Sequence, residues 1–204
     1  MVAQAADALQ PEGKRTVVLI PDLTRSGPTP LMVQTVADAL APRAKQVDFM
    51  VALGTHHGLN DEQMQELTGR TQAQWSQVHS NVRLLNHEWD NPDALKQIGS
   101  FPPDLMSKYT DGMLSEEIPI TVNRRAVEDY DLMLICGPVF PHEVVGMSGG
   151  NKYIFPGISG SEFLQFFHWV GALITIPKVI GNKHTRVREV LEVPHITKSP
   201  PGFS

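Results

Sequence analysis

The sequence has 204 residues but only one cysteine, little net charge and no apolar run long enough to cross a bilayer. The single cysteine, Cys136, excludes an intrachain disulfide framework and a zinc site built from several cysteines. The 17 basic and 22 acidic residues give a net charge of −5, so nothing in the overall charge attracts nucleic acid or an anionic membrane. Residues 1–10 lack the basic and apolar segments of a signal peptide. We therefore expect a cytoplasmic protein with no nucleic-acid partner and no membrane partner.

The apolar content of 41% is enough for a folded domain with a hydrophobic core. The sequence pattern predicts a strand at 16–20, a helix at 30–40, a strand at 47–53, and a helix that begins after a cap at Asn60. This β-α-β-α order predicts the α/β class, with a mostly parallel sheet and helices on both faces. Further predicted elements are a possible strand at 82–85, an irregular insertion at 101–117, an extended segment at 118–123, a buried strand at 130–137, and helices at 163–173 and 186–192.

Polar motifs follow the predicted strands, and the first of them is Asp22-Leu23-Thr24-Arg25. Open parallel sheets bind ligands just beyond the carboxyl ends of their strands, so these motifs are candidates for one shared site. The Arg25 guanidinium could hold a carboxylate or a phosphate through two parallel hydrogen bonds. The alternative is a simple turn in which Asp22 is a cap and Arg25 is solvated.

The second motif, Gly54-Thr55-His56-His57-Gly58, follows the next predicted strand. Adjacent side chains on an extended segment point in opposite directions, so only one of the two histidines can easily enter a given site. Histidine is the natural proton donor and acceptor near neutral pH, which makes His56 a candidate for acid–base catalysis. The alternative is a loop histidine without a chemical role.

The third motif is the glycine-rich segment 141–160, which contains His142, the turn Ser148-Gly149-Gly150, and Lys152. Glycines let backbone N–H groups approach an anion, and a lysine beside them could bind phosphate or attack a carbonyl-type group. The spacing is not that of a Walker loop. The segment also matches Gly-x-Ser-x-Gly, but no aspartate follows residue 131 and no strand enters the serine directly, which disfavours a serine hydrolase. Further on, His168 lies in an apolar helix, where a histidine is more often a core residue than a ligand.

The ordered set of these motifs resembles the nickel-dependent lactate racemase family, specifically its N-terminal domain. The resemblance spans about residues 15–190, and its most specific element is the spacing of sixteen residues between Lys152 and His168. The matching pieces, in chain order, are Asp22-x-Thr24-Arg25, Gly54-Thr55-His56, Val122-Asn123-Arg124, Pro141-His142, Ser148-Gly149-Gly150-x-Lys152, Pro156-Gly157 and His168.

The resemblance implies a cofactor, the nickel-pincer nucleotide, which is a pyridinium mononucleotide with two sulfur arms and a carbon that hold nickel. Lys152 matches the lysine that joins this cofactor through a thioamide, and His168 matches the histidine that ligates nickel. His56 and His142 match the two histidines that exchange the hydroxyl proton of a 2-hydroxy acid. The resemblance also implies that Asp22, Thr24 and Arg25 help to hold the cofactor or the substrate anion. It implies that the turn Ser148-Gly149-Gly150 lies against the cofactor.

The implied activity is that of an isomerase, a racemase or epimerase in which the cofactor accepts hydride from a 2-hydroxy acid. The implied organisation is one cofactor-binding domain, 1–193, followed by a linker or tail, 194–204. The second domain of family enzymes is absent from these 204 residues, so we expect that a further domain or a second chain is a partner. The enzymes that make the cofactor are also expected partners. The alternative is a non-catalytic module that binds the nucleotide or nickel. Asn151, Met147 and Tyr153 depart from the family's usual pattern, so the substrate could differ from lactate.

Overall fold

The structure is a computed structural model that describes residues 2–173 and residue 181. The chain forms two compact units. The first, here called the sheet unit, comprises Met1–His87 and Arg125–Gly137, and the second, the hairpin unit, comprises Glu88–Arg124 and Pro138–Ser204. The helix predicted at 186–192 and the tail at 194–204 lie outside the described residues. None of the helices in the described part of the chain is long and apolar enough to cross a membrane.

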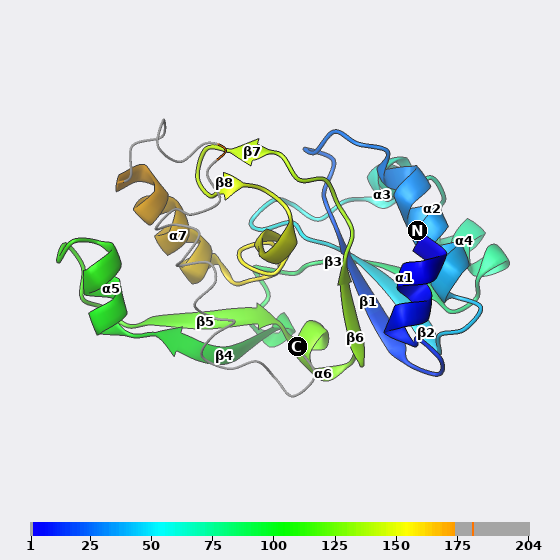
Figure 1. The fold of residues 1–204 in the computed structure, drawn as a ribbon, viewed down its shortest axis with the longest axis horizontal. Coiled ribbons are helices and arrows are strands. Elements are labelled where there is room, and N and C mark those ends of the chain that lie inside the picture. Colours follow the sequence, from blue (N-terminus) through cyan, green and yellow to red (C-terminus); the bar gives the residue numbers. More distant parts are fainter. Residues whose placement is uncertain (1, 174–180, 182–204) are drawn as a thin grey trace. The chain divides into compact units, whose positions relative to one another are not determined.

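The sheet unit contains a four-stranded parallel sheet with the strand order β3-β2-β1-β6 (Figure 1). Its strands are β1 Arg15–Ile20, β2 Gln46–Val51, β3 Val82–Asn86 and β6 Leu132–Ile135. Its helices are α1 Val2–Leu9, α2 Thr29–Leu40, α3 Asp61–Thr68, α4 Gln72–Val78 and the short α6 Arg124–Glu128. The predicted α/β class with a parallel sheet is confirmed. The strand predicted at 130–137 is shorter and only half-buried, because β6 lies at the end of the sheet.

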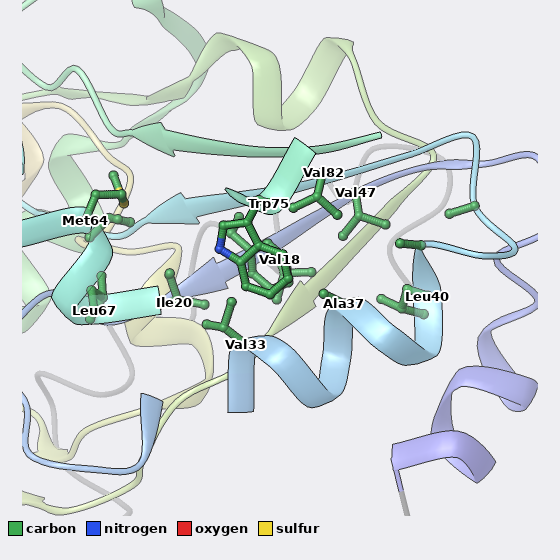
Figure 2. Packing of buried hydrophobic residues seen from close by; sticks show 14 of the residues in the cluster. Val18, Ile20, Val33, Ala37, Leu40, Val47, Met64, Leu67, Trp75 and Val82 are labelled. Carbon is green, nitrogen blue, oxygen red and sulfur yellow. The ribbon is translucent and has the colours of Figure 1, made fainter. Parts of the chain in front are cut away.

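The core of the sheet unit lies on one face of the sheet, where alternate strand positions meet helices α1 to α4. Val18 pairs with Phe49 in the register, and both side chains are fully buried. The indole of Trp75 from α4 packs against this layer, next to Val18 (Figure 2). It also stacks on Phe49, with ring centroids 6.3 Å apart. Burial of apolar surface of this kind is the main force that holds helices on a sheet.

Local signals fix the ends of these helices. Asn60 forms a capping box with Gln63 at the start of α3, as the predicted cap requires, and Gly69 ends the helix in the left-handed conformation. Thr71 caps α4 in the same way. The connection between β2 and β3 therefore contains two separately capped helices, α3 and α4.

The other face of the sheet carries a buried polar cluster around Asp48. This carboxylate is fully buried and accepts hydrogen bonds from Arg83, Tyr130 and Gln46. Burial, followed by the neighbouring Asp48 carboxylate, raises the pKa of Tyr130 above its usual value. The buried Asp48 carboxylate therefore has its hydrogen bonds supplied within the cluster, as buried polar groups in folded proteins usually do.

The hairpin unit is built around the antiparallel strands β4 Leu95–Phe101 and β5 Ile118–Asn123. Its other elements are η1 Pro92–Ala94, α5 Pro103–Tyr109, β7 Pro141–His142, β8 Gly146–Met147, η2 Gly150–Tyr153 and α7 Ser161–Leu173. Phe101 packs against Phe166 of α7, with ring centroids 5.3 Å apart. The prediction of an irregular insertion at 101–117 is wrong, because this segment contains α5 and connects the two strands of the hairpin.

Candidate functional site

The Asp22-Thr24-Arg25 motif lies at the point where the strand order of the sheet reverses. The chain runs from β1 to β2 and β3 on one side, whereas β6 pairs with β1 on the other side. Ligands of open α/β sheets bind beyond the strand ends at such a switch point. The segment is also a turn, since the Arg25 amide donates to the Asp22 carbonyl at 3.3 Å, and the side chains of Thr24 and Arg25 are exposed. A turn and an anion-binding position are therefore compatible here.

Asp22 is bonded to His56, a pair that the sequence analysis missed. The Asp22 carboxylate is only 7% exposed. Its Oδ1 accepts from the Thr24 amide at 3.1 Å and from the Thr24 hydroxyl at 2.5 Å, while Oδ2 lies 2.5 Å from Nδ1 of His56. The His56 side chain is 60% exposed. An imidazole oriented by a carboxylate is the usual arrangement of a general base, and the contact between Asp22 and His56 has this geometry.

The two motifs that contain Asp22 and His56 were visible in the sequence, but their contact could be predicted only from the register of β1 and β2. Ile20 pairs with Val51 in neighbouring parallel strands, so the segments that follow them leave the sheet at the same edge. Asp22 comes two residues after β1, and His56 follows β2 after a turn in which its amide donates to the Leu53 carbonyl. The adjacent His57 is also exposed, but the contact with Asp22 belongs to His56.

In the hairpin unit, His142 lies on β7 and is only 8% exposed. Its Nδ1 accepts a hydrogen bond from the Val144 amide at 3.0 Å. The Glu143 carboxylate lies 3.6 Å from the same nitrogen, which is beyond hydrogen-bond length, and its side chain is exposed. The buried imidazole is therefore held by its own turn.

The serine–glycine turn follows β8 and holds Lys152. Ser148 accepts from the Phe140 amide through its hydroxyl oxygen, at 2.8 Å, and donates its own amide to the Phe140 carbonyl at 2.7 Å. Gly149 and Gly150 both have positive φ angles, +80° and +55°. A Cβ on Gly149 would lie 2.6 Å from Cγ2 of Val139, so a side chain at this position would require Val139 to move, and the positive φ angle also favours glycine. The turn leads directly into η2, which carries Lys152.

His168 is exposed on α7, which contradicts the alternative that it is a core residue of an apolar helix and leaves its assignment as a nickel ligand a prediction. The buried face of α7 is formed instead by Phe163, Phe167 and Val170. Partial desolvation, followed by the positive charge of Lys152, lowers the pKa of His168, and Glu143 opposes the shift. A lowered pKa favours the neutral imidazole, which is the form that ligates a metal.

These residues fit a cofactor that is tethered to a lysine and brings most of its own metal ligands. Lys152 supplies the amine, and His168 supplies one imidazole, whose lowered pKa favours the neutral form. Imidazole is a good ligand for nickel. Within residues 2–173 and residue 181, no three histidine, cysteine, aspartate or glutamate side chains are grouped so that they could hold a metal ion.

The predicted site residues thus fall into two groups. One comprises Asp22, Thr24, Arg25 and His56 in the sheet unit, where the first two and His56 are joined by hydrogen bonds. The other lies in the hairpin unit and comprises His142, Ser148, Gly149, Gly150, Lys152 and His168.

Comparisons with known proteins place this chain in a family. The sequence model of the lactate racemase N-terminal domain matches residues 1–178. A lactate racemase from Thermoanaerobacterium thermosaccharolyticum is 28% identical over 162 residues, which are 77% of this chain and 33% of that protein.

Solved structures agree in fold. A crystal structure of a protein from Thermotoga maritima has a TM-score of 0.84 and 32% identity, over 96% of this chain and 46% of the other. The lactate racemase apoprotein from T. thermosaccharolyticum has a TM-score of 0.62 and 23% identity, over 93% of this chain and 40% of the other. This chain therefore spans between a third and a half of the length of these relatives. The match over residues 1–178 shows that the chain belongs to the lactate racemase N-terminal domain family.

Proposed function

We propose that this chain is the cofactor-bearing part of a racemase or epimerase that acts on a 2-hydroxy acid. The observation that carries the proposal is the hydrogen-bonded pair of Asp22 and His56 at the strand ends. A module that only binds a nucleotide or nickel has no need of a base oriented by a carboxylate. A reaction that removes a hydroxyl proton requires one.

The proposed cofactor is the nickel-pincer nucleotide, attached through Lys152, with His168 as the protein ligand of nickel. The turn formed by Ser148, Gly149 and Gly150 would lie along the nucleotide. When bound, this group supplies the acceptor for the Cα hydrogen of the substrate as hydride. The neutral state of His168, which its lowered pKa favours, is the state suited to ligation.

The remaining residues handle the substrate's proton and charge. His56 would take the hydroxyl proton, and Asp22 would stabilise the imidazolium that results. His142 would serve as the second proton-exchanging histidine. The exposed Arg25, next to this pair in sequence, would bind the substrate carboxylate. We further propose that the enzymes that synthesise the cofactor act on this chain, and that a further domain or second chain completes the enzyme.

The test is to produce the full chain together with the cofactor-synthesising enzymes and to measure intact mass and nickel content. We expect an added mass on the peptide that contains Lys152, and about one nickel per chain. Lys152→Ala should abolish the added mass, whereas Lys108→Ala, which removes a lysine of α5 in the same unit, should retain it. His168→Ala should keep the adduct and lose nickel, and Gln165→Ala, at another exposed position of α7, should keep both.

Activity separates an enzyme from a carrier. Loaded chain, supplied with the remaining family domain, should racemise a 2-hydroxy acid, and His142→Ala should keep adduct and nickel but lose turnover. An adduct that survives Lys152→Ala would contradict the tether. A fully loaded protein that turns over no 2-hydroxy acid would contradict the enzyme and favour the binding module.

A further inference from the structure

We propose that the protein holds its two site histidines in opposite tautomers, His56 protonated at Nδ1 and His142 protonated at Nε2. Asp22 and the backbone amide of Val144 are the positioning groups that impose these forms. The catalytic meaning of the assignment rests on the proposed function, but the assignment itself rests on hydrogen bonds within each unit.

The tautomer of His56 follows from the bonds of Asp22. An ionised carboxylate only accepts hydrogen bonds. Oδ1 already accepts from the amide and the hydroxyl of Thr24, and Oδ2 faces Nδ1 of His56 at 2.5 Å. The proton of this short contact must therefore come from Nδ1 of the imidazole. In the neutral ring, Nε2 then carries a lone pair and can accept a proton.

The tautomer of His142 follows from the opposite logic. A backbone amide only donates, and the Val144 N–H donates to Nδ1 at 3.0 Å. That nitrogen must therefore be unprotonated, so the neutral ring carries its proton on Nε2. The 3.6 Å distance to the Glu143 carboxylate would suit a protonated Nδ1, but the amide contact is shorter and has hydrogen-bond length.

The two histidines are consequently not interchangeable in this state. His56 is the base: the O–H bond of the substrate breaks, the proton moves to Nε2, and the imidazolium keeps its Nδ1–H against Asp22. His142 is a hydrogen-bond donor to oxygen through Nε2–H. For His142 to accept a proton at Nε2 in the reverse direction, the ring must first change to the other neutral tautomer. Nε2 releases its proton to water, and Nδ1 takes one from water and loses the Val144 bond, with Glu143 as the nearby acceptor for Nδ1–H.

The assignment can be tested on the cofactor-free chain by long-range ¹H–¹⁵N correlation NMR, which distinguishes the two tautomers by the shifts of the ring nitrogens. Spectra are recorded at a pH where both rings are neutral. The His56→Gln and His142→Gln variants identify the signals among the eight histidines. We expect protonated Nδ1 for His56 and protonated Nε2 for His142. The reverse form at either histidine, or an equal mixture, overturns the inference for that residue.

Two substitutions should change the tautomers in a predictable direction. In Asp22→Asn, the amide oxygen can keep both Thr24 donors, so the NH₂ group turns to Nδ1 and should convert most of His56 to the Nε2–H form. Val144→Pro removes the donating N–H and should release His142 from its single form. Glu143→Gln is the matched control and should leave His142 unchanged.

The wild-type spectrum decides the question even where Val144→Pro fails to fold. An unchanged His56 tautomer in folded Asp22→Asn would overturn the role of Asp22. Because these spectra require neither cofactor nor substrate, a wrong tautomer contradicts this inference alone. Failure to load Lys152 contradicts the proposed function alone.

Discussion

Replacing Gly149 by alanine should destabilise the hairpin unit more than the same change at another glycine with positive φ. Gly149 has φ +80° and ψ −178°, a region that only glycine occupies readily. Forcing alanine into it costs about 1–3 kcal/mol. The new Cβ would also lie 2.6 Å from Cγ2 of Val139 and 3.1 Å from the Pro138 carbonyl oxygen. Val139 is 59% exposed and can rotate away, at about 1 kcal/mol. The total is about 2–4 kcal/mol.

The matched control is Gly112→Ala in the same unit. Gly112 has φ +83°, but a Cβ there meets no atom within 4 Å, so only the backbone cost of about 1–2 kcal/mol applies. Native-state hydrogen exchange of the β5 and α7 amides measures the opening free energy of this unit directly. The loss of free energy should be larger for Gly149→Ala. Equal losses would refute the reasoning, since they would show that the turn before Lys152 accepts a side chain. We also expect Gly149→Ala to reduce adduct formation at Lys152.

Three further predictions concern charge. Lys152→Gln should raise the pKa of His168 and Glu143→Gln should lower it, because the two charges act on this imidazole in opposite directions. NMR titration of the cofactor-free chain measures both pKa shifts. An unchanged pKa of His168 in both variants would mean that neither charge acts on the ring. Asp48→Ala should destabilise the sheet unit by about 2–4 kcal/mol, because it leaves a half-exposed arginine and a half-buried tyrosine hydroxyl without their acceptor. Urea unfolding measures this loss, and a change below 1 kcal/mol would contradict it. Asp22→Asn should lower turnover of the loaded enzyme by roughly 10²–10⁴-fold, which is the range expected when a general base is lost or held in the wrong tautomer. Full activity of this variant would contradict the catalytic pairing of Asp22 with His56.

The residue types and spacings were sufficient to predict most of the sheet unit. The β-α-β-α order follows from short apolar runs and periodic helices, both of which are local properties of the chain. The cap at Asn60 was predictable for the same reason, because a capping box involves residues only three positions apart. The hairpin unit was harder, since β4 and β5 are separated by a segment with no clear period, and their pairing is a long-range contact.

The sequence by itself determined which side chains could carry the chemistry: a lysine after a glycine turn, histidines after strands, and an aspartate with an arginine at the end of β1. The tertiary structure alone decided how they are paired and oriented. Asp22 and His56 are 34 residues apart, and only the parallel pairing of β1 with β2 brings them into contact. The exposed side of α7 was instead marked in the sequence, because Glu162, Gln165 and His168 recur every third residue of the helix and all three are exposed.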